Sequence, residues 1–183
     1  MSLAITIVTT ANRTRRFFQT DPARISEIIE SLKGGPHFFD DRMLVIVGEL
    51  STEGFSASLI TRIELETEAD WSTVLPPSWR LDLRALAPGE LIGPGGIENG
   101  RLSADIDFFF QGGDTLAAWV ENSQPELTAE RVKRIAAFFE QKIIPYRLAT
   151  RGIGIINPAV LTRVSLGAKI TDPPAGAWFA NEV

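Results

Sequence analysis

The feature that most constrains this fold is an alternating strand that runs directly into a glycine turn, "RLSADIDFFFQGGDT" at residues 101–115. Successive side chains of a strand point to opposite faces of its sheet. One face therefore receives Leu102, Ala104, Ile106, Phe108 and Phe110, and the other receives Arg101, Ser103, Asp105 and Asp107. Glycine accepts the backbone angles of a tight turn, and "TLAAWVE" supplies a returning strand. The pattern predicts an antiparallel hairpin with one buried face.

Further strands are predicted from β-branched and alternating segments. "LAITIVTT" at 3–10 forms a first strand, and a loop with Arg13, Arg15 and Arg16 follows it. Residues 42–50 and 55–66 are two strands joined by the short loop 51–54, which is typical of a second antiparallel hairpin. The strand at 42–50 is apolar on both faces, so we expect it to be central in its sheet. The segment "WRLDLRAL" indicates another strand.

Two segments predict helices. At 22–33, Asp21 can cap the helix, Pro22 suits its first position, and the apolar residues follow one helical face. At 128–142 the same spacing recurs before Pro145. Residues 158–166 are ambiguous, since Asn157 and Pro158 can open a short helix while the β-branched residues suit a strand. We favour the helix there.

The order of these elements indicates the fold class. Adjacent hairpins require antiparallel pairing, and strands that follow one another in blocks argue against a doubly wound sheet. We expect an α+β fold with a largely antiparallel sheet of about six or seven strands and two main helices, 22–33 and 128–142, packed on one face. A chain of 183 residues buries roughly 70% of its unfolded surface, so a single domain over 1–183 is predicted. The Gly/Pro loop at 88–96 is the one candidate boundary.

Composition excludes several classes of site and partner. The chain has no cysteine, which removes disulfides, thiolate metal sites and cysteine nucleophiles. No apolar run approaches the roughly 20 residues of a membrane-spanning helix, and the N-terminus does not have the order of a signal peptide. The net charge of −5 disfavours nucleic acid. We therefore expect a cytoplasmic protein without a cofactor and without a membrane or nucleic-acid partner.

A carboxylate enzyme is the alternative hypothesis for function. Asp105 and Asp107 share one strand face and could hold a divalent metal, with help from His37 or Asp40, for a hydrolase or phosphotransferase reaction. The other interpretation is that these residues form a solvated strand face and turns, because aspartate readily bonds its own backbone. We favour the second interpretation, and no catalytic residue is assigned.

The favoured hypothesis is a protein-binding module, such as an inhibitor, an immunity-type neutraliser or an assembly component. Six carboxylates and one arginine lie between residues 49 and 70, so this window carries the whole net charge of −5. Tryptophan is enriched among the residues that dominate interfaces, and carboxylates at a rim speed encounter with a basic partner. The predicted partner-binding residues are Glu64, Glu66, Glu68, Asp70, Trp71 and Trp79. Whether the chain forms a homo-oligomer stays open, and no motif identifies a family.

Overall fold

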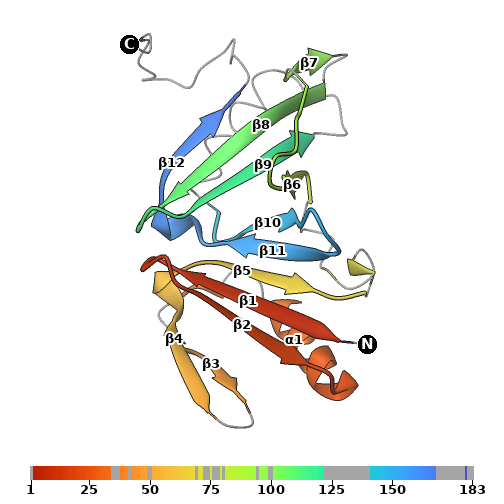
Figure 1. The fold of residues 1–183 in the computed structure, drawn as a ribbon, viewed down its shortest axis with the longest axis vertical. Coiled ribbons are helices and arrows are strands. Elements are labelled where there is room, and N and C mark those ends of the chain that lie inside the picture. The colour runs from red at the N-terminus through yellow and green to blue at the C-terminus, as the bar shows by residue number, and fades with distance from the viewer. Residues whose placement is uncertain are drawn as a thin grey trace.

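The structure is a computed structural model of the full chain. It describes residues 2–33, 38–40, 43–48, 51–68, 70, 71, 75, 79, 81–93, 95–98, 101–121, 141–167 and 180. Figure 1 shows a strand-dominated fold. The strands are β1 (Leu3–Thr9), β2 (Thr14–Gln19), β3 (Met43–Val47), β4 (Thr52–Ser56), β5 (Ile60–Glu66), β6 (Leu83–Ala85), β7 (Gly96–Glu98), β8 (Arg101–Phe110), β9 (Thr115–Glu121), β10 (Ile144–Arg147), β11 (Gly152–Ile156) and β12 (Leu161–Leu166). The helices are α1 (Pro22–Lys33) and the 3-10 turns η2 (Ala57–Leu59) and η4 (Pro158–Val160).

Ten of the described strands form one large mixed sheet. Its order is β12-β8-β9-β6-β10-β11-β5-β1-β2, with β7 paired to β8 at one edge. Pairing is antiparallel except between β6 and β10. The expected six or seven strands with two main helices are therefore wrong: the described chain has this larger sheet, a separate two-stranded sheet of β3 and β4, and α1 as its one α-helix. The predicted helix at 128–142 falls almost entirely on residues 122–140, outside the described residues.

The local signals at 22–33 correctly predicted α1. The Asp21 Oδ1 atom accepts a hydrogen bond from the Ala23 N–H at 2.9 Å, which satisfies one of the free donors of the first turn. Ile25, Ile29 and Leu32 are buried on one side of the helix, as their spacing requires. No helix among the described residues is long and apolar enough to cross a membrane.

Three predicted boundaries are wrong. The expected arginine loop is largely β2, an edge strand that pairs with β1 and carries Arg15 and Arg16. The expected strand 55–66 is two strands, because η2 ends β4 and lets β5 enter the large sheet. The helix favoured at 158–166 is a 3-10 turn followed by β12, which pairs with β8. Its cap is the one predicted, since the Asn157 side chain accepts the Ala159 N–H at 3.1 Å.

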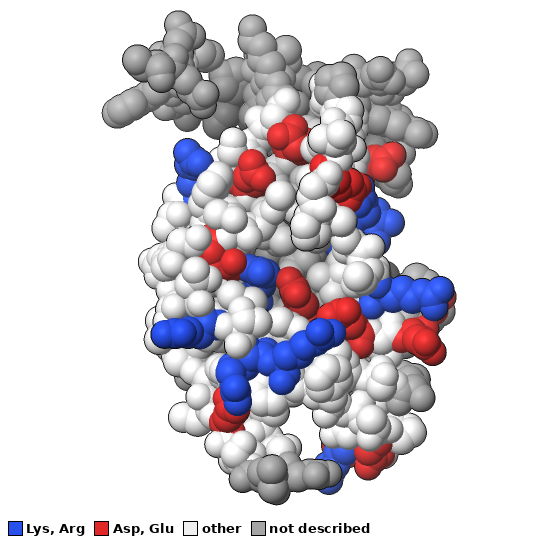
Figure 2. Space-filling model, viewed as in Figure 1, with Lys and Arg blue, Asp and Glu red and all other residues white. Residues whose placement is uncertain are grey.

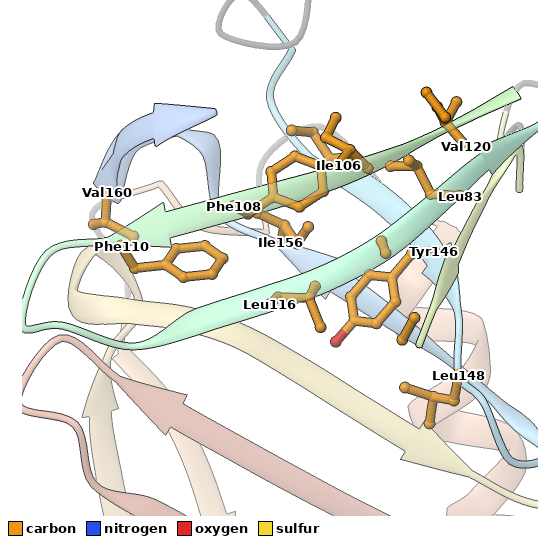
Figure 3. Close-up of a cluster of buried hydrophobic side chains, with 14 residues drawn as sticks. Leu83, Ile106, Phe108, Phe110, Leu116, Val120, Tyr146, Leu148, Ile156 and Val160 are labelled. Carbon is orange, nitrogen blue, oxygen red and sulfur yellow. The ribbon is translucent and has the colours of Figure 1, made fainter. Parts of the chain in front are cut away.

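Two hydrophobic clusters lie on opposite faces of the middle of the sheet. The first cluster lies between β8, β9 and β6 on one side and β10 and β11 on the other, around Phe108 and Tyr146 (Figure 3). The second is formed by β1, β5, β11 and α1, around Ile7 and Ile25. Strand β11 serves both, because Ile156 faces the first cluster while Ile153 and Ile155 face the second. This strand, and not 42–50, is a central strand buried on both faces.

Candidate functional site

The strand predicted to be central, β3, lies outside the large sheet and pairs only with β4 among the described residues. The hairpin of β3 and β4 occupies the end of the molecule opposite β8 and β9 (Figure 1). Its inner face is covered: Leu44, Ile46 and Phe55 pack against the second cluster. The Phe55 ring meets the Phe17 ring edge to face, with centroids 6.1 Å apart.

An ion pair ties the hairpin to the edge of the large sheet. Glu53 of β4 pairs with Arg15 of β2, and the Arg15 Nε donates to Glu53 Oε2 at 2.9 Å. The hydrogen bond from Arg15 lowers the pKa of the Glu53 carboxyl below its ordinary value. Because Glu53 lies opposite Ile46 in the register, its side chain leaves β4 on the inner face. The outer face therefore carries no charge from this glutamate.

The outer face of the hairpin is apolar and exposed. Met43, Val45 and Val47 are 69%, 48% and 76% exposed. Opposite them on β4 lie small residues, in the register Met43–Ser56, Val45–Gly54 and Val47–Thr52. A Cβ added at Gly54 would lie 2.7 Å from the Met43 Sδ, so this thioether already rests over the glycine. We call these six residues the outer hairpin face; it consists of a raised apolar row beside a low row of small residues, and none of the six is ionisable.

This exposure conflicts with the sequence of β3. A strand that is apolar on both faces normally has both faces covered. Strand β11 meets that rule inside this chain, whereas β3 has only its inner face covered. Phe18, an exposed apolar residue on the edge strand β2, differs in having a guanidinium over it, with Arg16 Cζ 5.3 Å from its ring centre. Among the described strands, the outer hairpin face is therefore the apolar face that other residues of the chain cover least.

The predicted partner-binding residues differ in exposure and in the contacts they make. Glu64 and Glu66 of β5 are engaged within the chain, and the Glu66 Oε1 lies 3.1 Å from Arg16 Nη2. Trp71 is 7% exposed and belongs to the second cluster, and Trp79 packs partly buried against the same cluster. Glu68 and Asp70 are exposed. Binding by these residues stays a prediction. In Figure 2 basic and acidic side chains alternate over the middle of the molecule, in keeping with ion pairs there.

A charged network lies where β5 meets the first cluster. The Arg62 Nε donates to Glu64 Oε1 at 2.9 Å, and the Tyr146 hydroxyl donates to the same oxygen at 2.9 Å. Asp114, from the turn between β8 and β9, forms an ion pair with Arg62. The three charged side chains are only 12–21% exposed. Every strong donor here has a carboxylate partner, which is typical of a structural network that joins the hairpin turn to β5.

The Tyr146 side chain passes over Gly154 of β11 to reach Glu64. In the register, Tyr146 of β10 lies beside Gly154 of β11, which lies beside Glu64 of β5. A Cβ at Gly154 would overlap the Tyr146 ring, so only glycine lets the ring lie across β11. Burial, followed by the nearby charge of Glu64, raises the pKa of the Tyr146 hydroxyl well above its ordinary value. The hydroxyl is therefore a hydrogen-bond donor and not an acid at neutral pH.

Among the described residues, those predicted for a metal enzyme do not gather into a metal site. Asp105 and Asp107 share the polar face of β8, as expected, and are half-buried. The Asp105 carboxylate lies so close to Gly167 that a Cβ added to this glycine would overlap it. The Gly167 N–H donates a hydrogen bond to the Asp105 backbone oxygen at 2.9 Å. His37 lies outside the described residues, and Asp40 is half-buried just before β3. Within the described ranges no three histidine, cysteine or carboxylate side chains are placed to hold a metal ion.

Comparisons with known proteins give no match, either to a protein-family model, to a curated protein or to a solved structure.

Proposed function

We propose that this chain is a non-catalytic protein-binding module of the cytoplasm and that it binds its partner through the outer hairpin face. The observation that carries the proposal is the exposure of Met43, Val45 and Val47 on a strand that is apolar on both faces. Contiguous exposed apolar residues commonly mark protein interaction sites. The inner face of β3 is covered by this chain, and the proposed partner covers the outer face.

The gain from covering this face can be estimated from its exposure. Full burial of a valine or methionine side chain contributes about 1.5–3 kcal/mol. With roughly half to three quarters of each side chain exposed, the three together supply about 3–6 kcal/mol on burial. That amount is large enough to anchor an interface, and the remaining affinity must come from contacts around it.

The absence of charge on this face favours one kind of binding module. Inhibitors and toxin neutralisers that capture a charged partner rely on charged surfaces for fast encounter. Homodimer interfaces and the buried centres of other interfaces are more apolar. Among the roles of inhibitor, immunity-type protein and assembly component, the outer hairpin face best supports the assembly component. This proposal does not require the partner to be basic.

Copurification from the cell that naturally makes the protein tests this proposal. The comparison is between the native chain, Val45→Asp and the control Leu91→Asp, which introduces the same charge at a residue that is 97% exposed. We expect specific partners with the native chain and with Leu91→Asp, and their loss with Val45→Asp, because the interface would bury an unpaired carboxylate. Equal recovery of partners by all three folded proteins would contradict the proposal.

A further inference from the structure

Resting on the proposed function, we further propose that the partner is a second copy of this chain, and that two outer hairpin faces pack on each other about a two-fold axis. A two-fold interface uses the same patch on both subunits, so the patch must be complementary to itself. The outer hairpin face meets this condition in shape and in charge.

The shape is self-complementary because the face has one raised row and one low row. Met43, Val45 and Val47 project from β3, while the residues opposite them on β4 are Ser56, Gly54 and Thr52. A two-fold axis between the two strands places β3 of each copy over β4 of the other. Each raised row then enters the low row of its partner, as side chains interdigitate between stacked sheets. The flexible Met43 side chain of the same copy rests over Gly54, so it turns away where the partner's raised row enters.

The charge distribution favours the same contact. Each copy has a net charge of −5, so two copies repel over most orientations. The outer hairpin face has no ionisable side chain, and Glu53 leaves β4 on the opposite face, where it pairs with Arg15. Two copies that meet here bring no described carboxylates of the hairpin into contact. A charged partner would find nothing on this face to recognise.

The size of the face sets the expected strength. A standard interface removes roughly 800 Å² from each partner, about 20 residues or more a side. Six residues around three exposed apolar side chains form only the centre of such an interface. We therefore expect a reversible dimer whose population depends on protein concentration.

Sedimentation equilibrium of the purified full chain, across a range of concentrations, measures this association. The expected result is a rise from the monomer mass of 20.1 kDa to twice that value. We expect Val45→Asp to raise the dissociation constant about 100-fold or more, since it would bury an unpaired carboxylate. Leu91→Asp should leave it unchanged. A mass that stays at 20.1 kDa at all concentrations overturns the inference.

A second variant tests the same interface in case Val45→Asp does not fold. Gly54→Phe fills the low row, and on the folded monomer the group nearest to a new Cβ is the flexible Met43 side chain. It should abolish the dimer while circular dichroism and melting temperature stay close to native. If it dimerises like the native chain, the packing proposed here is wrong.

Cross-linking detects the dimer directly and does not depend on a variant that loses binding. The chain has no cysteine, so Val45→Cys places a single thiol on the outer hairpin face and Leu91→Cys places one elsewhere. A short bismaleimide should join two Val45→Cys chains and leave Leu91→Cys monomeric. If the chain is monomeric in both assays while Val45→Asp still loses partners in the cell, the second copy is excluded and the protein-binding proposal stands. If Val45→Asp loses nothing there, both proposals fail.

Discussion

Replacing Asp114 by asparagine tests whether the charged network joins the hairpin turn of β8 and β9 to β5. Asp114 follows a turn in which Gly112 and Gly113 have φ angles of 84° and 88°, and its carboxylate pairs with Arg62. The asparagine keeps the size of the side chain and removes its charge. Arg62 keeps its hydrogen bond to Glu64 at 2.9 Å, so the guanidinium is left partly and not fully unpaired.

The magnitude follows from burial. Removing one partner of a fully buried ion pair costs about 3–5 kcal/mol, whereas exposed pairs contribute about 0–1 kcal/mol. Asp114 and Arg62 are 12% and 15% exposed, near the buried limit, but the second carboxylate offsets part of the loss. We expect Asp114→Asn to lower the free energy of unfolding by about 2 kcal/mol, between these limits. For a chain of this length that lowers the melting temperature by about 4–8 °C.

Chemical denaturation and calorimetry measure both quantities. Asp105→Asn is a matched control on the same hairpin, because Asp105 is half-buried and lies against Gly167 and not against Arg62. It should change stability by less than about 0.5 kcal/mol. A double-mutant cycle with Arg62→Gln isolates the coupling of the pair. If Asp114→Asn is no more destabilising than Asp105→Asn, the network does not join the turn to β5.

Three further predictions concern single groups. Gly154→Ala should destabilise the protein by about 3 kcal/mol or more, as measured by urea unfolding, because its Cβ would overlap the buried Tyr146 ring. Gly93→Ala is the control, because an added Cβ there meets no atom within 4 Å. Tyr146 is the one tyrosine of the chain, and its raised pKa predicts no phenolate absorbance at pH 10 in the folded protein. In the unfolded chain Tyr146 ionises at a lower pH than in the folded protein, so the free energy of unfolding falls as the pH rises above 10. Hydrogen bonds lower the pKa of Glu90 to about 2, first those from Arg84 and then the one from the Ala87 N–H. The Glu90 carboxylate therefore stabilises the fold fully above pH 4.5, and this contribution is lost as the pH falls from 4.5 to 2. The loss of stability in this pH range should be smaller in Glu90→Gln; equal acid curves would contradict this.

The elements that the sequence predicted well are those specified by neighbouring residues. Helix α1 has its cap, its first-turn proline and its apolar spacing within one short segment. The hairpin of β8 and β9 likewise has its alternation and its glycine turn in one stretch, and Phe108 and Phe110 are buried as the alternation requires. Such local signals do not depend on which distant strand becomes a neighbour.

The errors come from contacts between residues distant in sequence. No strand was predicted at "GIGII", residues 152–156, where Gly154 lets the Tyr146 ring pass over β11, a contact that no local pattern contains. Strand β2 was missed because Arg15 and Arg16 are polar. They suit an edge strand, and their partners Glu53 and Glu66 are 38 and 50 residues away.

The surroundings of the predicted partner-binding residues were missed for a related reason. The carboxylates Glu64 and Glu66 look like a free acidic surface until Arg62, Arg16 and Tyr146 are placed beside them. The signal for the outer hairpin face was present in the sequence, as a strand apolar on both faces. We predicted a central strand there, because the sequence alone does not show whether the residues that cover the second face of a strand belong to the same chain or to a partner.

Photo-cross-linking along β3 tests most directly whether the outer hairpin face is a contact surface. A photoreactive residue is placed in turn at positions 43 to 47 and irradiated in the cell. We expect covalent protein adducts, including a doubled chain, from positions 43, 45 and 47, whose side chains point outward. We expect none from positions 44 and 46, which pack against the second cluster. Adducts that lack this alternation, or no adducts from positions 43, 45 and 47, would contradict it.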